Sequence, residues 1–226
     1  MDIKSDAFIE LAKVFSDHGY NLYLVGGTVR DILLGLPLND MDAVTDATPD
    51  EMKGFLDGDF TFAKMGSIKV KYNDVKFDIT TLRKEKGYKD HRHPGEVIFV
   101  KDLKTDHVRR DFTVNAMYMD EHFKLYDFEN GLEDVNNHIL RMVGNPKKRL
   151  KEDPLRVIRC LRFSLTYNFT IEAKLEKSLI ASIKFLNSLS KDKTKMELKK
   201  FDLSQKEEMI KLFDKYSIKH LLDVIE

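Results

Sequence analysis

The chain has 226 residues, 42% of them apolar, with 38 Lys and Arg side chains balancing 38 Asp and Glu side chains. This composition predicts one large or two small folded domains and excludes intrinsic disorder. Because the sequence has no run of ~20 apolar residues, no signal peptide and one cysteine, Cys160, we expect a cytoplasmic protein without membrane spans, disulfides or multi-cysteine zinc sites.

The first 50 residues alternate short helices with short strands. Apolar spacing and turn residues predict, in order, a helix over residues 4–18, a strand over 21–25, a helix over 29–34, a strand over 41–45 and a helix capped by Thr48. Gly26 and Gly27 join the first strand to the second helix, so a glycine turn precedes a helix N-terminus.

The middle of the chain has the alternation of β-structure. Residues 60–82 alternate apolar and polar side chains and predict a β-meander, whereas the polar, Gly- and Pro-containing segment 84–95 predicts a mobile loop. Residues 114–119 and 123–128 predict a hairpin.

After residue 138 helical spacing continues to the C-terminus, and a capping-box pattern predicts a helix start at Ser204. The apolar ending, residues 221–225, needs covering, which favours a second copy or another partner. We place the domain boundary near 140, and the charges divide there too. Residues 1–140 carry 18 basic and 26 acidic side chains, and residues 141–226 carry 20 and 12. The acidic half favours cations and the basic half phosphate, unless the asymmetry arose by chance.

Three aspartates form the first candidate site. Asp40 and Asp42 are separated by one residue at the start of a predicted strand, so their side chains project to the same side. If the strand that carries Asp78 pairs beside this one, three carboxylates converge, and carboxylates that repel one another favour a cation such as Mg²⁺. The simpler alternative is that Asp40 caps a turn and Asp78 faces solvent.

The glycine turn and nearby arginines suggest anion binding. Backbone N–H groups at Gly26 and Gly27 can approach an anion, and Arg30 has the length to reach a triphosphate or ribose. Two glycines also form ordinary strand-to-helix turns. Likewise, Arg109 and Arg110 have the alternative of a simple surface pair.

Four segments in order resemble motifs of the class II tRNA nucleotidyltransferases, the family of CCA-adding enzymes and bacterial poly(A) polymerases. The matching segments are residues 24–35 followed by 40–42, residues 77–83 followed by 88–94, residues 109–117 and residues 152–163. The resemblance implies an α+β fold with a polymerase-beta-like nucleotidyltransferase head, a mixed sheet with flanking helices, over residues 1–140. It also implies a small all-α neck with the base-recognition helix and part of a body over residues 141–226.

The resemblance also implies roles for the candidate residues of the head. Asp40 and Asp42 would bind Mg²⁺ and Asp78 would be the third catalytic carboxylate. Nucleotide binding would involve Gly26, Gly27, Arg30, Arg109, Arg110, Asp111 and Asn115. At least one of the paired arginines would contact the triphosphate, and Asp111 and Asn115 would organise ribose recognition.

In the neck, the resemblance makes Asp153 and Arg156 the readers of the incoming base, with Arg159 and Arg162 continuing the nucleotide-binding stripe. A carboxylate accepts from the exocyclic amine of cytosine or adenine, and an arginine donates to the neighbouring ring nitrogen. Uracil and guanine present a carbonyl instead, so the protein would act as the template. Without the resemblance, an N-cap aspartate followed by a solvated arginine face is the simpler interpretation.

The implied reaction is addition of C and A from CTP and ATP to a tRNA 3′ end or another RNA 3′ end. Poly(A) synthesis, CC-only or A-only addition, and a non-catalytic RNA- or nucleotide-binding module remain alternatives. His91, His93 and His107 favour loop or structural roles over a metal site, and the lysines of residues 191–200 fit a solvated face as well as RNA contact.

Overall fold

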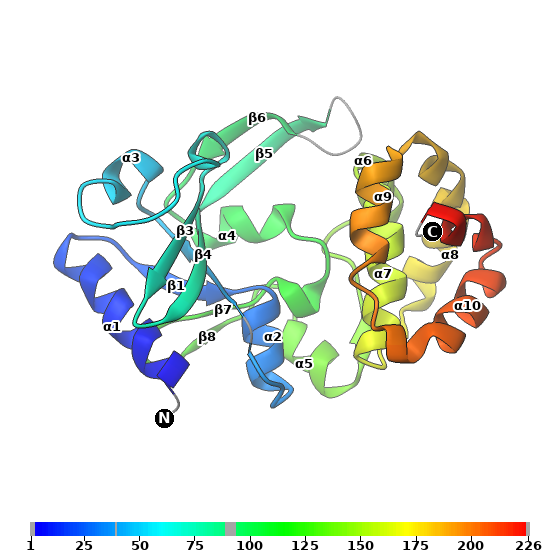
Figure 1. Cartoon of the computed structure of the whole chain (residues 1–226), viewed down its shortest axis with the longest axis horizontal. Coiled ribbons are helices and arrows are strands. Elements are labelled where there is room, and N and C mark those ends of the chain that lie inside the picture. The colour runs from blue at the N-terminus through cyan, green and yellow to red at the C-terminus, as the bar shows by residue number, and fades with distance from the viewer. Residues whose placement is uncertain (1–2, 39, 89–93, 225–226) are drawn as a thin grey trace. The chain divides into compact units, whose positions relative to one another are not determined.

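The computed structural model describes residues 3–38, 40–88 and 94–224 (Figure 1). It divides into two compact units. Unit 1 comprises residues 1–86 and 96–135, and unit 2 comprises residues 87–95 and 136–226. This division does not assign a function to either unit, so the catalytic head over residues 1–140 and the neck over residues 141–226 remain predictions.

A six-stranded mixed sheet forms the centre of unit 1, with strand order β3-β4-β2-β1-β7-β8. The strands are β1 (Leu22–Val25), β2 (Met41–Thr45), β3 (Ser67–Tyr72), β4 (Val75–Thr81), β7 (Tyr118–Met119) and β8 (Leu125–Tyr126). Only the β2–β4 pair is parallel; the other neighbours are antiparallel. This mixed α+β architecture agrees with the fold class expected from the sequence.

Helix α1 (Ile3–Asp17) covers part of this sheet with an apolar stripe. Phe8, Leu11 and Phe15 recur at helical spacing and are fully buried. Each such side chain contributes about 1.5–3 kcal/mol through removal of apolar surface from water. The remaining helices of this part are short: α2 (Gly27–Leu33), α3 (Pro49–Met52), α4 (Leu103–Asp106) and α5 (Gly131–Asn136).

The β-meander prediction is correct for two of its three strands. β3 and β4 form a hairpin through Asn73 and Asp74, both with positive φ, as a tight two-residue turn requires. The expected strand at Phe60 and Phe62 is wrong: this stretch contains turns, and Ala63–Met65 forms a 3-10 helix. Phe62 is 58% exposed, so its apolar side chain is not buried as a strand residue on the inner face of a sheet would be.

The loop predicted over residues 84–95 is also wrong in its described part. β5 (Arg83–Tyr88) and β6 (Pro94–Phe99) pair as a separate two-stranded sheet. Backbone pairing to β6 therefore outweighs the loop preference of this polar sequence. The predicted hairpin after residue 114 is shorter than expected: β7 and β8 pair at Tyr118 and Tyr126, and Thr113–Asn115 forms a 3-10 helix.

Unit 2 is mainly helical, and its apolar side chains form a core of its own. Its helices are α6 (Pro146–Glu152), α7 (Leu155–Thr166), α8 (Ala173–Ser182), α9 (Lys191–Leu198) and α10 (Lys206–Lys215), with 3-10 helices at Ile183–Ser188, Leu203–Gln205 and Lys219–Val224. A parallel pair of two-residue strands, β9 (Ile139–Leu140) and β10 (Thr170–Ile171), completes it. On α7, Val157, Ile158 and Leu161 are fully buried.

One expectation near the C-terminus changes. Gln205, without a side-chain cap bond, is the N-cap of α10, so the predicted capping box at Ser204 does not form the helix start. In the apolar ending, Leu221 is 6% exposed, Leu222 and Val224 are half-buried, and residue 225 lies outside the described residues, so the covering partner stays a prediction.

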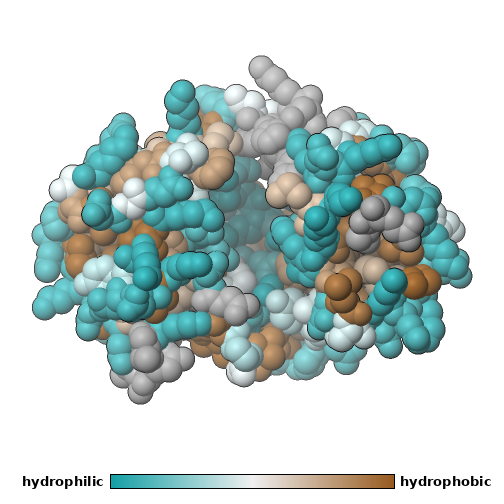
Figure 2. All heavy atoms as spheres, viewed as in Figure 1, coloured by the Kyte–Doolittle hydropathy of each residue, from teal (hydrophilic) through white to brown (hydrophobic). Residues whose placement is uncertain are grey.

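The surface is largely hydrophilic on the face seen in Figure 2, with apolar side chains gathered in patches. None of the helices in the described ranges is long and apolar enough to cross a lipid bilayer.

Candidate functional site

The parallel pairing of β2 with β4 brings two of the predicted carboxylates side by side. Asp42 and Asp78 are directly opposite each other in the register of these strands. Asp40 lies two residues before Asp42, and both side chains are exposed. The strand arrangement on which the convergence of the carboxylates depended is therefore present, while their catalytic roles stay predictions.

Asp42 is reached by solvent yet largely surrounded by protein atoms. This partial desolvation raises the pKa of Asp42, and the charges of Asp78 and Asp40 raise it further, against the opposing effect of Arg110 and Arg30. Asp78 also pairs with Lys69 across the β3–β4 hairpin, at 3.6 Å between Nζ and Oδ1. The two strands thus hold carboxylates whose mutual repulsion a cation would relieve.

The donor set fits Mg²⁺, which prefers oxygen ligands and usually takes one or two carboxylates together with substrate phosphates and waters. No three His, Cys, Asp or Glu side chains in the described part of the chain form a ready-made metal cluster. A two-carboxylate site that the substrate completes is consistent with both observations.

The predicted glycine turn lies beside these carboxylates. Gly26 has φ of 65°, a conformation that side chains disfavour, and is the N-cap of α2. A Cβ there would lie 3.6 Å from Arg110 Nη1 and 3.9 Å from Asp42 Oδ2. The backbone N–H of Asp42 donates to the Thr28 hydroxyl at 2.8 Å, which fixes β2 against the first turn of α2.

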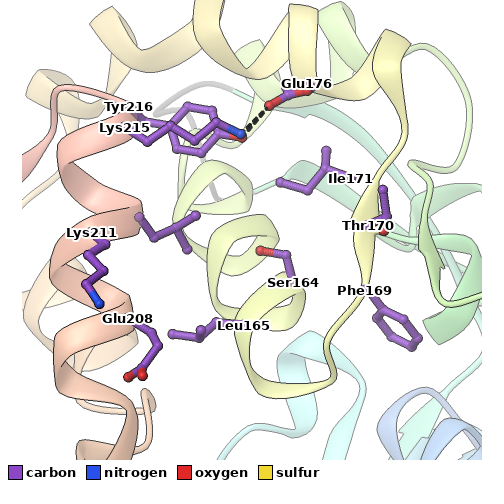
Figure 3. A pocket seen from close by; sticks show the side chains of 11 residues that line it. Ser164, Leu165, Phe169, Thr170, Ile171, Glu176, Glu208, Lys211, Lys215 and Tyr216 are labelled. Carbon is purple, nitrogen blue, oxygen red and sulfur yellow. Dashed lines mark hydrogen bonds and ion pairs between the residues drawn. The ribbon is translucent and has the colours of Figure 1, made fainter.

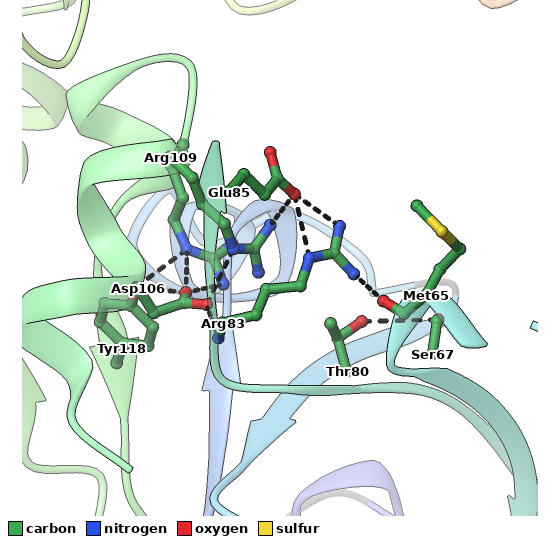
Figure 4. A network of polar contacts seen from close by, with 9 residues as sticks. Met65, Ser67, Thr80, Arg83, Glu85, Asp106, Arg109 and Tyr118 are labelled. Atoms are coloured by element: carbon green, nitrogen blue, oxygen red, sulfur yellow. Dashed lines mark hydrogen bonds and ion pairs between the residues drawn. The ribbon is translucent and has the colours of Figure 1, made fainter. Parts of the chain in front are cut away.

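A buried carboxylate, Asp106, organises both paired arginines (Figure 4). Its Oδ1 accepts from Arg109 Nε at 2.8 Å, and its Oδ2 accepts from Arg110 Nη2 at 3.0 Å. The Tyr118 hydroxyl donates to Oδ2 at 2.8 Å. Burial alone would raise the pKa of Asp106, but the charges of Arg110 and Arg109 hold it well below its usual range.

The two arginines consequently face different surroundings. Arg110 extends toward Gly26 and Asp42. Arg109 instead points toward Glu85, at 3.7 Å between Nη1 and Oε1, and Glu85 also pairs with Arg83 at 2.8 Å. The alternative of an exposed surface pair is wrong, since both side chains are at most 15% exposed.

Arg30 is buried beside the glycine turn, with Nη2 3.3 Å from where a Cβ at Gly27 would lie, and its contact with a substrate stays a prediction. Its side chain is 5% exposed, pairs with Asp31 at 2.8 Å and donates from Nη1 to Asn115 Oδ1 at 2.7 Å. Asn115 in turn donates to Asp111 Oδ1 at 3.2 Å. Arg30 therefore braces the segment that carries Asp111 and Asn115.

In unit 2, Asp153 and Arg156 lie at the junction of α6 and α7. Asp153 Oδ1 accepts from the N–H of Leu155 at 3.1 Å. Arg156 is buried, donates to the Arg149 carbonyl at 2.8 Å and lies 3.7 Å from Glu152. A carboxylate thus offsets the unfavourable helix dipole at this first-turn cation.

The solvated arginine face considered for α7 is wrong, because Glu197 of α9 draws the arginines inward. Glu197 Oε1 lies 3.0 Å from Arg162 Nη2 and 4.0 Å from Arg159 Nη1, and Glu197 itself is 5% exposed. Arg162 is 9% exposed and Arg159 is half-buried. Nothing in the spacing of residues 191–200 singled out Glu197.

Unit 2 also contains a pocket of about 530 Å³ between the C-terminal end of α7, β10, α8 and α10 (Figure 3). None of the predicted site residues lines it. At the edge of this pocket, Glu176 accepts from Lys215 Nζ at 2.8 Å and from the Tyr216 hydroxyl at 2.7 Å. These bonds fix α8 to α10, a structural role.

The histidine predictions have separate outcomes. His107 Nε2 lies 3.0 Å from Glu129 Oε1 and packs near Phe128, which agrees with a structural role. His91 and His93 lie outside the described residues.

Residues 22–141 match the model of the poly A polymerase head domain, which is more than half of the chain. The chain belongs to this family. It is 42% identical over 191 residues to a CCA-adding enzyme of Staphylococcus epidermidis, and this match covers 84% of the chain and 48% of the relative. The chain therefore spans about half the length of the curated relatives it matches.

Solved structures give the same result for the fold. The structure of the Bacillus stearothermophilus CCA-adding enzyme in complex with CTP matches 96% of this chain and 53% of its own, with a TM-score of 0.86 and 29% identity. A tRNA nucleotidyltransferase complexed with a primer tRNA and an incoming ATP analog matches 95% of this chain and 62% of its own, with a TM-score of 0.74 and 26% identity. The predicted resemblance to class II nucleotidyltransferases is confirmed.

Proposed function

We propose that this chain adds C and A residues to tRNA 3′ ends from CTP and ATP, without a template and with release of pyrophosphate. The observation that carries the proposal is the register pairing of Asp42 with Asp78, beside the glycine turn and Arg110. The CCA-adding relatives and the CTP-bound homologue support the choice of reaction and substrates.

Asp40 and Asp42 would hold Mg²⁺ through their exposed carboxylates. When bound, the ion would supply charge stabilisation for the phosphates and a lowered pKa for the attacking 3′-hydroxyl. Asp78 would add negative charge beside the 3′-hydroxyl and favour departure of its proton. The reaction joins the 3′-oxygen to the α-phosphorus of the nucleotide and breaks the α–β phosphoanhydride bond.

Of the two paired arginines, Arg110 is our candidate for the triphosphate contact. Its Nη1 faces the glycine turn and Asp42, whereas Arg109 is directed to Asp106 and Glu85. Arg109 would then support the network, and the backbone at Gly26 and Gly27 would approach the phosphates. Asp111 and Asn115 would bind the ribose, with Arg30 holding Asn115 in place.

Asp153 and Arg156 would select the base. Asp153 is half-buried and Arg156 is fixed by the Arg149 carbonyl and Glu152, so both would present their polar atoms in defined directions. Arg159 and Arg162 of α7, both paired with Glu197, would continue the set of nucleotide-binding residues beyond Asp153 and Arg156.

The test is extension of a labelled tRNA that ends at the discriminator base, with Mg²⁺ and CTP, ATP or both, resolved at single-nucleotide length. Addition of C, C and A followed by a stop is the expected result. A long A tract would instead identify a poly(A) polymerase, and addition of C alone or A alone a partial activity. No extension at any protein concentration would contradict the proposal and favour a binding module.

A further inference from the structure

Tyr118 carries a hydroxyl into a cluster of apolar side chains in unit 1. It lies on β7, is fully buried and packs with Val25, Val44 and Leu82. The hydroxyl nevertheless contacts two charged groups. It donates to Asp106 Oδ2 at 2.8 Å and accepts from Arg110 Nε at 3.0 Å.

These contacts fix the direction of the Arg110 side chain. Asp106 Oδ2 accepts from Arg110 Nε at 3.2 Å and from Nη2 at 3.0 Å, and the guanidinium lies over the Tyr118 ring at 5.0 Å from its centroid. Asp106 thus binds one edge of the guanidinium, and the Tyr118 ring packs against one of its faces. The remaining nitrogen, Nη1, is the one beside Gly26 and Asp42.

We propose that Tyr118 is a positioning residue that aims Arg110 Nη1 at the phosphates of the incoming nucleotide. This inference rests on the proposed function and extends it to a residue that touches no substrate. An arginine has several rotatable bonds, so a guanidinium held at both Nε and Nη2 has already lost the freedom that phosphate binding would otherwise remove.

The protonation state of the hydroxyl agrees with this role. Burial raises the pKa of Tyr118, and the charge of Asp106 also raises it, while Arg110 opposes both. The hydroxyl therefore stays protonated and keeps donating to Asp106. As a result, Asp106 Oδ2 and the hydroxyl form a fixed acceptor pair for Arg110 Nε.

Tyr118→Phe removes the hydroxyl and retains the buried ring, which makes it the test variant. The matched control is Tyr126→Phe on the neighbouring strand β8, because the Tyr126 hydroxyl also donates to a carboxylate, Asp120, at 3.0 Å. Thermal unfolding of both variants and of the unmodified chain establishes that each is folded at the assay temperature.

Binding of CTP in the presence of Mg²⁺ is measured by calorimetry, and inhibition of CTP incorporation is measured with inorganic pyrophosphate. For Tyr118→Phe we expect the Kd of CTP, its KM and the inhibition constant of pyrophosphate to rise together by about tenfold, the loss typical of a hydrogen bond to a charged group. The kcat should stay within about twofold, since Arg110 remains able to reach the phosphates. Tyr126→Phe should leave all four quantities unchanged.

A double-mutant cycle separates positioning from general stabilisation. In an Arg110→Lys background, Tyr118→Phe should cause no further loss of CTP affinity, because the guanidinium that it aims is absent. An undiminished effect of Tyr118→Phe in that background would overturn the inference.

The remaining outcomes are distinct from one another. If the unmodified chain binds CTP and the Tyr118→Phe variant binds it with the same affinity, the inference is overturned and the proposed function stands. Weaker CTP binding without weaker pyrophosphate inhibition, or an unfolded Tyr118→Phe variant, would mark Tyr118 as structural only and also overturn it. Absence of CTP binding by the unmodified chain would overturn both proposals.

Discussion

Replacement of Glu197 by alanine should destabilise the chain far more than its position in a lysine-rich helix suggests. Glu197 is 5% exposed and accepts from Arg162 Nε at 3.1 Å and from Lys200 Nζ at 2.9 Å. The variant leaves the guanidinium of Arg162 buried without its carboxylate. Breaking a buried ion pair by removing one partner costs about 3–5 kcal/mol.

The size of this loss of stability depends on which of the cations around Glu197 can still reach water. Lys200 and Arg159 can turn toward water, since their side chains are 54% and 30% exposed, and they add little to the loss. The Arg162 side chain is buried and cannot do so without disturbing the packing of α7 against α9. We therefore expect about 3 kcal/mol for Glu197→Ala, near the lower end of the range for buried pairs.

Urea unfolding followed by circular dichroism measures this loss as a change in the midpoint and the extrapolated free energy of unfolding. The control is Asp192→Ala, an exposed carboxylate on the same helix, for which we expect about 0.5 kcal/mol or less. The double variant Glu197→Ala/Arg162→Leu should recover much of the loss, because no buried charge remains unpaired. Equal effects of the Glu197 and Asp192 substitutions would refute the reasoning.

Three further predictions concern the remaining parts of the candidate site. Asp106→Asn should destabilise the chain by a constant amount above about pH 5. The difference in unfolding free energy between this variant and the unmodified chain should shrink as the pH falls below 3.8, the ordinary pKa of an Asp side chain, because the pKa of Asp106 is lower in the folded state. Urea unfolding from pH 3 to 7 measures this difference. Gly26→Ala should cost about 1 kcal/mol in stability, since φ is 65°, and should raise the KM of CTP; a cost near zero would contradict the strained turn. Asp153→Ala should reduce discrimination against UTP and GTP in single-nucleotide incorporation while thermal unfolding stays within a few degrees; unchanged discrimination would contradict the role of the protein as template.

The sequence was sufficient for the elements whose signals are local. The strands at 22–25 and 41–45 and the first helix follow from periodicity and turn residues alone. The convergence of Asp42 and Asp78 was predictable only conditionally, because it depends on which strands become neighbours. Asp106 also carried a local signal, since its carboxylate lies four residues before Arg110, a helical spacing that favours an ion pair.

Other contacts join residues far apart in the chain and leave no local pattern. Glu197 lies 35 residues beyond Arg162, so the arginines of α7 read as a solvated face until α9 packs beside them. In the same way, residues 84–88 read as a loop because pairing with β6 is not encoded in their composition. Phe60 and Phe62 show the opposite error: the alternation is local, but pairing with β3 stops at a single bridge between Asp59 and Lys69, and the chain then turns.

The most direct test of the central claim is Mg²⁺-dependent incorporation of CTP into tRNA by the unmodified chain, Asp42→Ala and the exposed-carboxylate control Asp50→Ala. The carboxylate pair of β2 and β4 predicts that Asp42→Ala loses at least about a thousandfold in incorporation rate with its thermal unfolding unchanged, whereas Asp50→Ala retains full activity. Incorporation by Asp42→Ala at a rate close to that of the unmodified chain would contradict the assignment of the catalytic centre.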